Sequence, residues 1–175
     1  MNILLVSLGA FLVAGCSLTP QGLQPVGKFE VERYLGTWYE IARLDHRFER
    51  GLSHVSADYS RRDDDGIRVV NRGYDRAKKK WKEATGRAYF TGDSDVARLK
   101  VSFFRPFYGG YNVIALDRDD YSWALVCGPS RDYLWVLARS RKLDDATLRQ
   151  VLEAAAGMGF DTGKLIYPEH HTPTD

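Results

Sequence analysis

Eight short segments rich in β-branched and aromatic residues follow one another along most of this chain, and they constrain its fold more than any other feature. Clusters of Gly and Asp separate several of them, as at 63–66, 92–93 and 109–110. The predicted strands are Thr37–Arg43, Val55–Arg62, Ile67–Tyr74, Trp81–Phe90, Ala97–Phe103, Tyr111–Asp117, Trp123–Cys127 and Tyr133–Arg139. Consecutive hairpins favour an up-and-down antiparallel sheet, and eight strands can close into a barrel with room for one small ligand. The predicted fold is therefore all-β, an eight-stranded up-and-down antiparallel barrel.

One amphipathic helix is predicted after the last of these strands. It begins at Asp144 or Asp145, either of which can cap the first turn, and it ends at Gly157 or Gly159. Its apolar residues have the spacing i, i+3, i+4, i+7 and are Leu148, Val151, Leu152 and Ala155. A single apolar stripe is typical of a helix packed on the outside of a barrel. A final short strand is predicted at Lys164–Tyr167.

The first segment is interpreted as a targeting signal. Ile3–Val13 is apolar and uncharged, and it has roughly half of the ~20 residues that a helix needs to cross a bilayer. It leads into Val13-Ala14-Gly15-Cys16, which resembles a bacterial lipobox, whose cysteine thiol receives a diacylglyceryl group before cleavage. The alternative is an ordinary secretory peptide with an incidental cysteine. The predicted division is a signal peptide at 1–15, a lipid-anchored tether at 16–28 and a barrel domain at 29–175.

The charge of the chain limits which partners it is expected to bind, and its cysteine content limits which thiol chemistry it is expected to perform. The net charge is +2, and Lys and Arg are spread along the chain, so nucleic acid is not an expected partner. Cys16 and Cys127 are the only cysteines, and a lipid on Cys16 leaves Cys127 without an intrachain partner. We therefore expect Cys127 to be a small buried hydrophobe. A nucleophilic thiol is the alternative, but no histidine lies near it in the sequence.

Three motifs resemble the signatures of the lipocalin family. Gly36-Thr37-Trp38 stands on the first predicted strand and is similar to the G-x-W signature. The segment 111–126 looks like the second signature, although Leu116 and Arg118 depart from its Thr-Asp-Tyr core. Leu134–Arg139 looks like the third. The resemblance covers nearly all of the chain after the targeting signal. Within the family, the local sequence is most similar to the bacterial outer-membrane branch. Ser17 after the anchor cysteine also resembles lipoproteins sorted to the outer membrane.

The resemblance assigns a structural role to Gly36, Trp38 and Arg139. The first strand of such a barrel begins, and the eighth ends, at the same closed end, so Trp38 and Arg139 are expected to meet. A guanidinium stacked on an indole is worth about 1–2 kcal/mol when desolvated. Arg139→Ala is therefore expected to loosen the closed end rather than to change ligand choice.

The same topology places four loops at the mouth, where specificity is expected to reside: Leu44–Ser53, Asp75–Lys80, Phe104–Gly110 and Gly128–Asp132. The stretch Phe103–Tyr108 is unusually aromatic, and its rings either fold over the rim or form a lip that faces lipid. A basic run lies beside the second loop, at Arg76, Lys78, Lys79, Lys80 and Lys82. Its ordinary reading is a solvated hairpin, and phosphate binding is the alternative.

Alternation along the strands predicts which side chains line the interior. If Trp38 and Arg139 point inward, then Trp135, Leu137, Glu40 and Ala42 share their face. Trp135 is the leading ligand-contact residue, and Leu137 and Ala42 are also expected in the pocket. Tyr111 is expected near the mouth, where its hydroxyl can bond a ligand head group. Both aromatic residues could equally be core filler. A buried Glu40 needs a partner or a raised pKa, and its expected role is hydrogen bonding near the base.

An enzyme is the main rival class. Runs of Asp at 63–65, 119–120 and 144–145 invite a metal or acid–base interpretation, but all three lie at predicted turns or at a helix start. The sequence has no Gly-rich phosphate loop, no HExxH, no CxxC and no G-x-S-x-G. No catalytic residue, metal or cofactor is therefore predicted, although a few lipocalins are enzymes.

The resemblance implies a hydrophobic ligand, with a fatty acid or a lysophospholipid as the expected partner. It also implies a protein anchored through Cys16 on the periplasmic side of the outer membrane, active in membrane maintenance or envelope stress. A homodimer is left open. The contrasting hypothesis is a structural envelope protein whose barrel is filled by its own aromatic side chains, and a dry or filled interior favours it.

Overall fold

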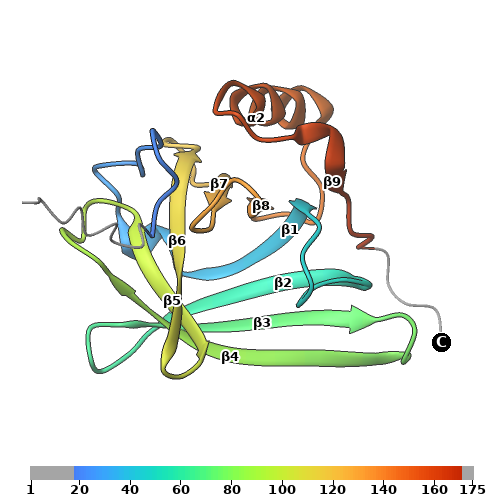
Figure 1. The fold of residues 1–175 in the computed structure, drawn as a ribbon, viewed down its shortest axis with the longest axis horizontal. Helices are drawn as coiled ribbons and strands as arrows, with labels where there is room; N and C mark the ends of the chain where they lie inside the picture. Colours follow the sequence, from blue (N-terminus) through green and yellow to red (C-terminus); the bar gives the residue numbers. More distant parts are fainter. Residues whose placement is uncertain (1–17, 171–175) are drawn as a thin grey trace, which may run out of the picture.

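The computed structural model describes residues 18–170. The predicted signal peptide and Cys16, the predicted lipid-anchor residue, lie outside these residues. Figure 1 shows the strands as one strongly curved sheet with helix α2 (Asp145–Gly157) beside it. The strands are β1 (Gly36–Leu44), β2 (Leu52–Arg61), β3 (Ile67–Asp75), β4 (Lys80–Phe90), β5 (Arg98–Phe104), β6 (Phe107–Leu116), β7 (Trp123–Cys127), β8 (Leu134–Ala138) and β9 (Leu165–Ile166).

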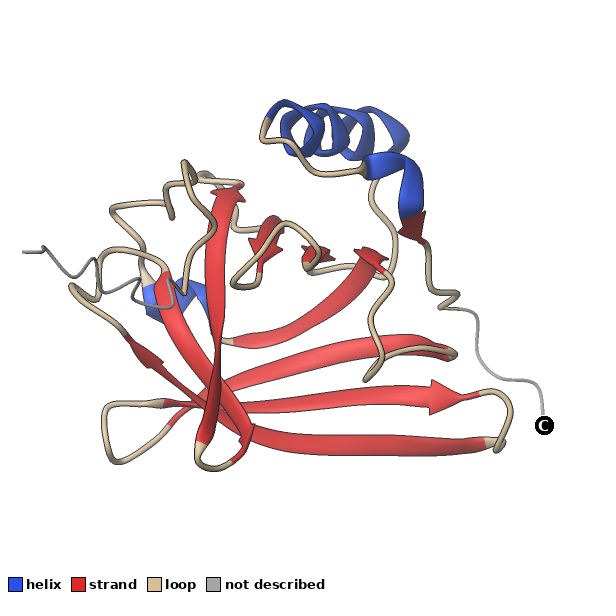
Figure 2. Ribbon diagram, in the orientation of Figure 1, coloured by secondary structure: helices blue, strands red, loops and turns tan. Residues whose placement is uncertain are grey.

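Antiparallel pairing closes the first eight strands into a barrel (Figure 2). Each strand from β1 to β8 pairs with the next one in the chain, and β8 pairs back onto β1. The short β9 adds to the outer end of β1, opposite Arg43 and Leu44. The predicted all-β, eight-stranded up-and-down barrel with one later helix is confirmed.

Helix α2 packs on the outside of the barrel, as its apolar stripe predicts. The Asp144 carboxylate caps it by accepting hydrogen bonds from the amides of Ala146 (3.1 Å) and Thr147 (2.9 Å). Val151 and Ala155 are buried against the outward face of β1, β7 and β8. We call this layer the outer cluster; its buried members are Ile41, Ala42, Leu44, Ile114, Leu125, Cys127, Leu134, Val136, Ala138, Leu143, Val151, Ala155 and Phe160.

Cys127 lies in the outer cluster and is fully buried, as expected. Burial raises the pKa of its thiol to about 12, so almost none of it is thiolate near neutral pH. A nucleophilic role for this cysteine has no support from its surroundings.

Two features at the N-terminal side were not predicted. A helix of four residues, α1 (Val31–Tyr34), precedes β1 at the closed end. Residues 18–28, predicted as a tether, lie along the barrel instead of extending from it. The Val26 amide donates to the Val113 carbonyl (2.9 Å), the Ala97 amide donates to the Val26 carbonyl (2.9 Å), and Asn112 Nδ2 donates to the Leu18 carbonyl (2.8 Å). These residues therefore add little to the reach of the anchor.

The connections divide between two ends of the barrel. The start of β1 and the end of β8 share the closed end with the connections 62–66, 91–97 and 117–122. The connections 45–51, 76–79, 105–106 and 128–133 lie at the open end. The predicted mouth loop Phe104–Gly110 is mostly strand, because β6 already begins at Phe107. The longest connection at the open end is 45–51, which joins β1 to β2.

Candidate functional site

The closed end is sealed by Trp38 and Arg139, as the family resemblance implies. The Arg139 guanidinium lies 3.9 Å from the centroid of the Trp38 ring, and Trp38 has no exposed surface. Arg139 also donates to the carbonyls of Arg33 (2.6 Å), Thr37 (3.0 Å) and Tyr121 (3.4 Å). Gly36 supports this geometry because its φ is +90°, which favours glycine.

A floor of three tyrosines lies above this seal. The Tyr111 hydroxyl is 2.7 Å from the Tyr34 hydroxyl and 2.8 Å from the Tyr59 hydroxyl. Burial raises the pKa of all three phenols, so the trio stays neutral. The expected place of Tyr111 near the mouth was wrong: its strand starts at the mouth, but its hydroxyl reaches α1 at the closed end. The observed partners of this hydroxyl are other tyrosines, not a free head-group position.

Apolar side chains fill the half of the barrel nearer the closed end. We call this layer the interior cluster; its buried members are Phe29, Tyr34, Trp38, Tyr59, Ile67, Val69, Ala88, Ala97, Leu99, Val113, Leu116, Tyr121, Ala124, Val126 and Leu137. A cavity between the tyrosine floor and β3, β4 and β5 has a volume of about 10 Å³. That is room for about one water molecule, not for an alkyl chain.

Charged side chains are buried in the mouth half of the barrel. Arg43 Nη1 donates to Glu40 Oε1 (2.5 Å), and Arg43 Nη2 donates to the Glu49 carbonyl (2.9 Å). Trp135 Nε1 donates to Glu49 Oε2 (3.0 Å), and His46 Nε2 lies 3.1 Å from the same oxygen. All of these residues except Trp135 are less than one-tenth exposed. The connection 45–51 therefore folds inward and places a carboxylate against Trp135.

A proton held on Glu40 reduces the negative charge buried in this cluster. Burial and the adjacent Glu49 carboxylate raise the pKa of Glu40 to about 8, against the attraction of Arg43. Burial opposes ionisation of Glu49 too, but the close contact and charge of His46, the hydrogen bond from Trp135 and the charge of Arg43 outweigh it and lower the pKa of Glu49. Near neutral pH, Arg43 therefore lies beside an ionised Glu49 and a protonated Glu40. Glu40 therefore has both the partner and the raised pKa that its burial requires. That partner, Arg43, lies in the mouth half of the barrel and not at the base.

Glu40 is expected to make the stability of the protein depend on pH between about 5 and 8. Its pKa is raised on folding, so the folded state holds a proton that the unfolded chain releases above its ordinary pKa of 4.5. The free energy of unfolding should fall as pH rises through this window. Urea unfolding of the wild type and of Glu40→Gln at several pH values measures the effect. The difference between the two proteins should change with pH, and a constant difference would contradict the assignment.

The structure places the predicted pocket residues on two different faces. Trp135 and Leu137 lie inside the barrel, against the interior cluster. Ala42 lies in the outer cluster and pairs with Val136, so its expected place in the pocket was wrong. The reason is a shift of register between Glu40 and Ala42 in the β1–β8 pairing, which breaks the alternation of faces.

Sequence reasoning missed Arg43, His46 and Glu49 as members of the interior. Arg43 points inward only because of the same irregularity in β1. The other two lie on a connection whose sequence has no pattern that marks burial. Only the carboxylate on Glu40 was singled out as needing a partner.

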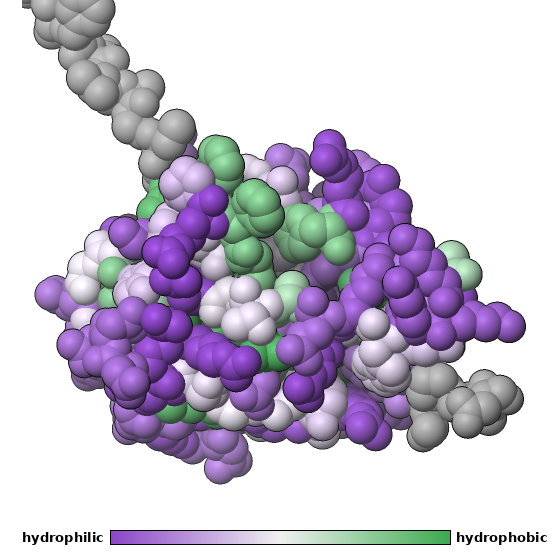
Figure 3. All heavy atoms as spheres, turned by 90° about the horizontal axis from the view of Figure 1, so that it is seen from below, coloured by the Kyte–Doolittle hydropathy of each residue, from purple (hydrophilic) through white to green (hydrophobic). Residues whose placement is uncertain are grey.

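The aromatic stretch at the β5–β6 turn is exposed. Phe104 and Phe107 are 79% and 73% exposed, so these two rings are not folded over the rim, and Phe103 is 41% exposed. Figure 3 views the face that carries this turn and shows hydrophobic side chains gathered within a hydrophilic surround. In the basic run, Arg76 pairs with Glu169, and Lys82 pairs with Asp75 (2.7 Å). These pairs support the solvated-hairpin interpretation of the run.

No group of three side chains able to hold a metal ion occurs among residues 18–170. Over the same residues, none of the helices has the length and apolar character to cross a membrane. The Asp runs are at turns and at the α2 cap, where Asp64 binds Arg62 and Tyr89 and Asp144 binds backbone amides. Their contacts in the structure are those of turn formation.

Comparison with known proteins gives one consistent family. The Lipocalin-like domain model matches residues 29–170. Outer membrane lipoprotein Blc of Citrobacter freundii is 58% identical over 160 residues, covering 90% of each chain. Outer membrane lipoprotein Blc of Vibrio cholerae is 50% identical over 167 residues, covering 95% of this chain and 98% of the relative. Among solved structures, insecticyanin from the tobacco hornworm has a TM-score of 0.68 at 18% identity, covering 90% of this chain and 88% of that one.

Proposed function

The chain belongs to the lipocalin family, and from this premise we propose that it is an outer-membrane lipoprotein that holds one single-chain lipid, a fatty acid or a lysophospholipid, in its barrel. Lipocalins are in general binding and transport proteins rather than enzymes. The relatives named as outer membrane lipoproteins support a lipid anchor on Cys16 in that membrane. A place on its periplasmic side is part of the proposal. Maintenance of the membrane or a response to envelope stress is the proposed setting.

The observation that carries the proposal is the arrangement of Trp135 and Glu49 at the open end. The indole lies on the interior face of β8, and its partner carboxylate belongs to the connection 45–51, not to the barrel wall. Outward movement of this connection would open the space above the interior cluster. We propose that the chain enters there, with Trp135 and Leu137 against it.

The energetics of such a ligand are adequate. Burial of a methylene is worth about 0.8 kcal/mol, so eight to ten methylenes supply about 6–8 kcal/mol before ordering costs. This range corresponds to dissociation constants of about a micromolar or weaker. Displacement of Glu49 from Trp135 subtracts from it, so micromolar affinity is the upper expectation.

A second candidate is favoured by one observation. The interior cavity of about 10 Å³ is too small for a chain, as expected of a structural envelope protein with a filled barrel. The two candidates differ in one property: whether connection 45–51 yields to a ligand. A binding experiment distinguishes them.

The experiment uses a protein of residues 18–170, which contain the closed barrel and both apolar clusters. Lysophospholipid, free fatty acid and diacyl phospholipid are titrated while Trp fluorescence is followed. Single-chain lipids are expected to saturate the signal at micromolar concentration, and Trp135→Phe should remove most of the change. Trp123→Phe is the matched control, because Trp123 packs against the outer cluster. No response to any lipid, confirmed by calorimetry, would reject the carrier and favour the filled barrel.

A further inference from the structure

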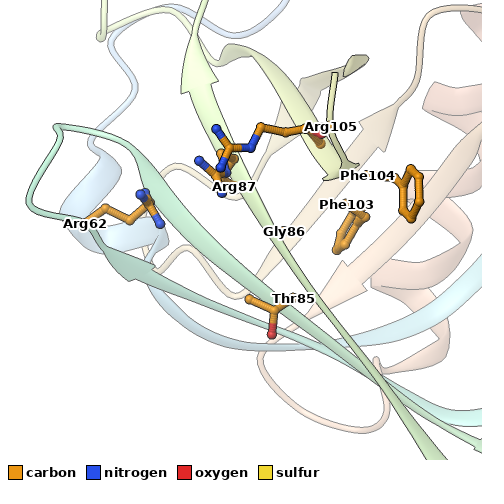
Figure 4. Close-up of a pocket in the computed structure, with 8 residues that line it drawn as sticks. Arg62, Thr85, Gly86, Arg87, Phe103, Phe104 and Arg105 are labelled. Carbon is orange, nitrogen blue, oxygen red and sulfur yellow. The ribbon is translucent and has the colours of Figure 1, made fainter. Parts of the chain in front are cut away.

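A second pocket lies between β4 and β5, away from the interior cluster. Its volume is about 260 Å³, and Figure 4 shows its lining. It forms where the strands separate: β5 pairs with β4 only along Arg87–Phe90, whereas β4 runs back to Lys80. The lining residues are Arg62, Thr85, Gly86, Arg87, Ser102, Phe103, Phe104 and Arg105.

Three arginines line this pocket, and no acidic side chain does. Arg62 is oriented by Asp64, to which its Nε and Nη2 donate at 2.8 Å each. Among residues 18–170, the guanidinium groups of Arg87 and Arg105 have no hydrogen-bond or ion-pair partner. Figure 4 shows their guanidinium ends directed into the same space. Because a guanidinium cannot lose its charge in a protein, the pocket holds a concentrated positive charge with unused donors.

A buried hydroxyl at this pocket provides a second, independent observation. Ser102 is only 4% exposed and lines the same pocket, and its Oγ has no hydrogen-bond partner within residues 18–170. A buried hydroxyl without a partner is costly, so it calls for a physical explanation. A hydroxyl together with guanidinium groups is a donor set suited to an oxyanion.

The other side of the pocket is apolar. The Phe103 ring packs so close to Gly86 that a Cβ there would lie 2.8 Å from it, which only glycine permits. Phe104 is beside it and is 79% exposed. The pocket therefore offers cationic donors next to exposed aromatic rings.

We propose that this pocket binds a phosphate group, with Arg87 and Arg105 paired to its oxygens and Ser102 donating a hydrogen bond. Fork-shaped guanidinium groups match phosphate oxygens in geometry as well as charge. The phosphate is either free inorganic phosphate or part of a phospholipid head group at a bilayer surface, and the exposed Phe rings fit the second. The site lies outside the interior cluster and does not depend on the proposed lipid cargo.

Calorimetric titration of residues 18–170 with inorganic phosphate tests the site. The wild type should bind one phosphate, and Arg87→Gln/Arg105→Gln should bind at least tenfold more weakly. Ser102→Ala should weaken binding several-fold without lowering the midpoint of urea unfolding, because it removes an unpaired buried hydroxyl. A purely structural role for Ser102 would not produce this combination. The matched control is Lys142→Gln/Arg149→Gln, which removes two exposed cations elsewhere and should bind as the wild type does.

Flotation with vesicles of phosphatidylethanolamine and phosphatidylglycerol distinguishes the two sources. If the source is lipid, vesicle binding should fall in Arg87→Gln/Arg105→Gln and in Phe103→Ser/Phe104→Ser. If it is free phosphate, only the calorimetric titration should respond to the arginine substitutions. Either result supports the site. Absence of both kinds of arginine-dependent binding, or an equal loss in the control variant, would overturn it. The cargo proposal is tested separately through Trp135 fluorescence.

Discussion

Replacement of Arg43 with alanine is expected to lower the free energy of unfolding by about 3–5 kcal/mol, because it removes the cation from a buried charged group. Arg43 is 1% exposed and bonds both the Glu40 carboxylate and the Glu49 carbonyl. Without it, Glu49 keeps a buried negative charge and its carbonyl loses a donor. Urea unfolding measures the loss, which should grow above pH 8, where Glu40 also becomes charged.

The double variant Glu49→Gln/Arg43→Met provides the control for this prediction. It removes the ionised carboxylate together with the cation and fills the space with an apolar chain, so it should recover part of the lost stability. A loss of less than about 1 kcal/mol in Arg43→Ala would mean that water already reaches these groups. The charged group would then be an exposed one, contrary to its burial.

Arg139→Ala is expected to lower the free energy of unfolding by about 3 kcal/mol, because it removes a cation–π contact and hydrogen bonds that hold the closed end. Three carbonyls, on Arg33, Thr37 and Tyr121, lose the same donor. The dissociation constant for a single-chain lipid should change less than twofold, because the tyrosine floor separates Arg139 from the mouth half. Urea unfolding and the fluorescence titration measure the two quantities on one preparation.

Arg141→Ala is the matched control for Arg139→Ala. Arg141 also lies over an aromatic ring, 5.3 Å from the centroid of Tyr39, but it is exposed. Its removal should change stability by less than about 0.5 kcal/mol. A lipid dissociation constant that rises tenfold in a folded Arg139→Ala protein would instead place Arg139 in the binding machinery.

Local sequence patterns predicted the strands because apolar alternation and turn residues act over a few positions. Seven of the eight barrel strands begin within three residues of the prediction, and β6 begins four residues early, at Phe107 instead of Tyr111. The Asp144 cap and the stripe on α2 are equally local. The meeting of Trp38 with Arg139 followed from barrel closure, a global property that the strand count fixes.

The interior of the mouth half was not predictable by the same reasoning. One irregularity after Glu40 turned Ala42 outward and Arg43 inward, and alternation cannot anticipate where such a shift occurs. Glu49 is buried because its connection folds back onto Trp135, a contact between residues 86 positions apart. Tyr111 found its partners on α1 and β2, and the short α1 has no periodicity to reveal it.

The most direct test of the proposed cargo locates a bound lipid. Uniformly ¹³C-labelled palmitate is added to residues 18–170, and intermolecular nuclear Overhauser effects are measured by NMR. Effects between the palmitate chain and both the Trp135 indole and the Leu137 methyl groups are expected, because the chain should lie inside the barrel above the interior cluster. Effects confined to the exposed rings of Phe104 and Phe107, or none at all, would contradict a lipid held in the barrel.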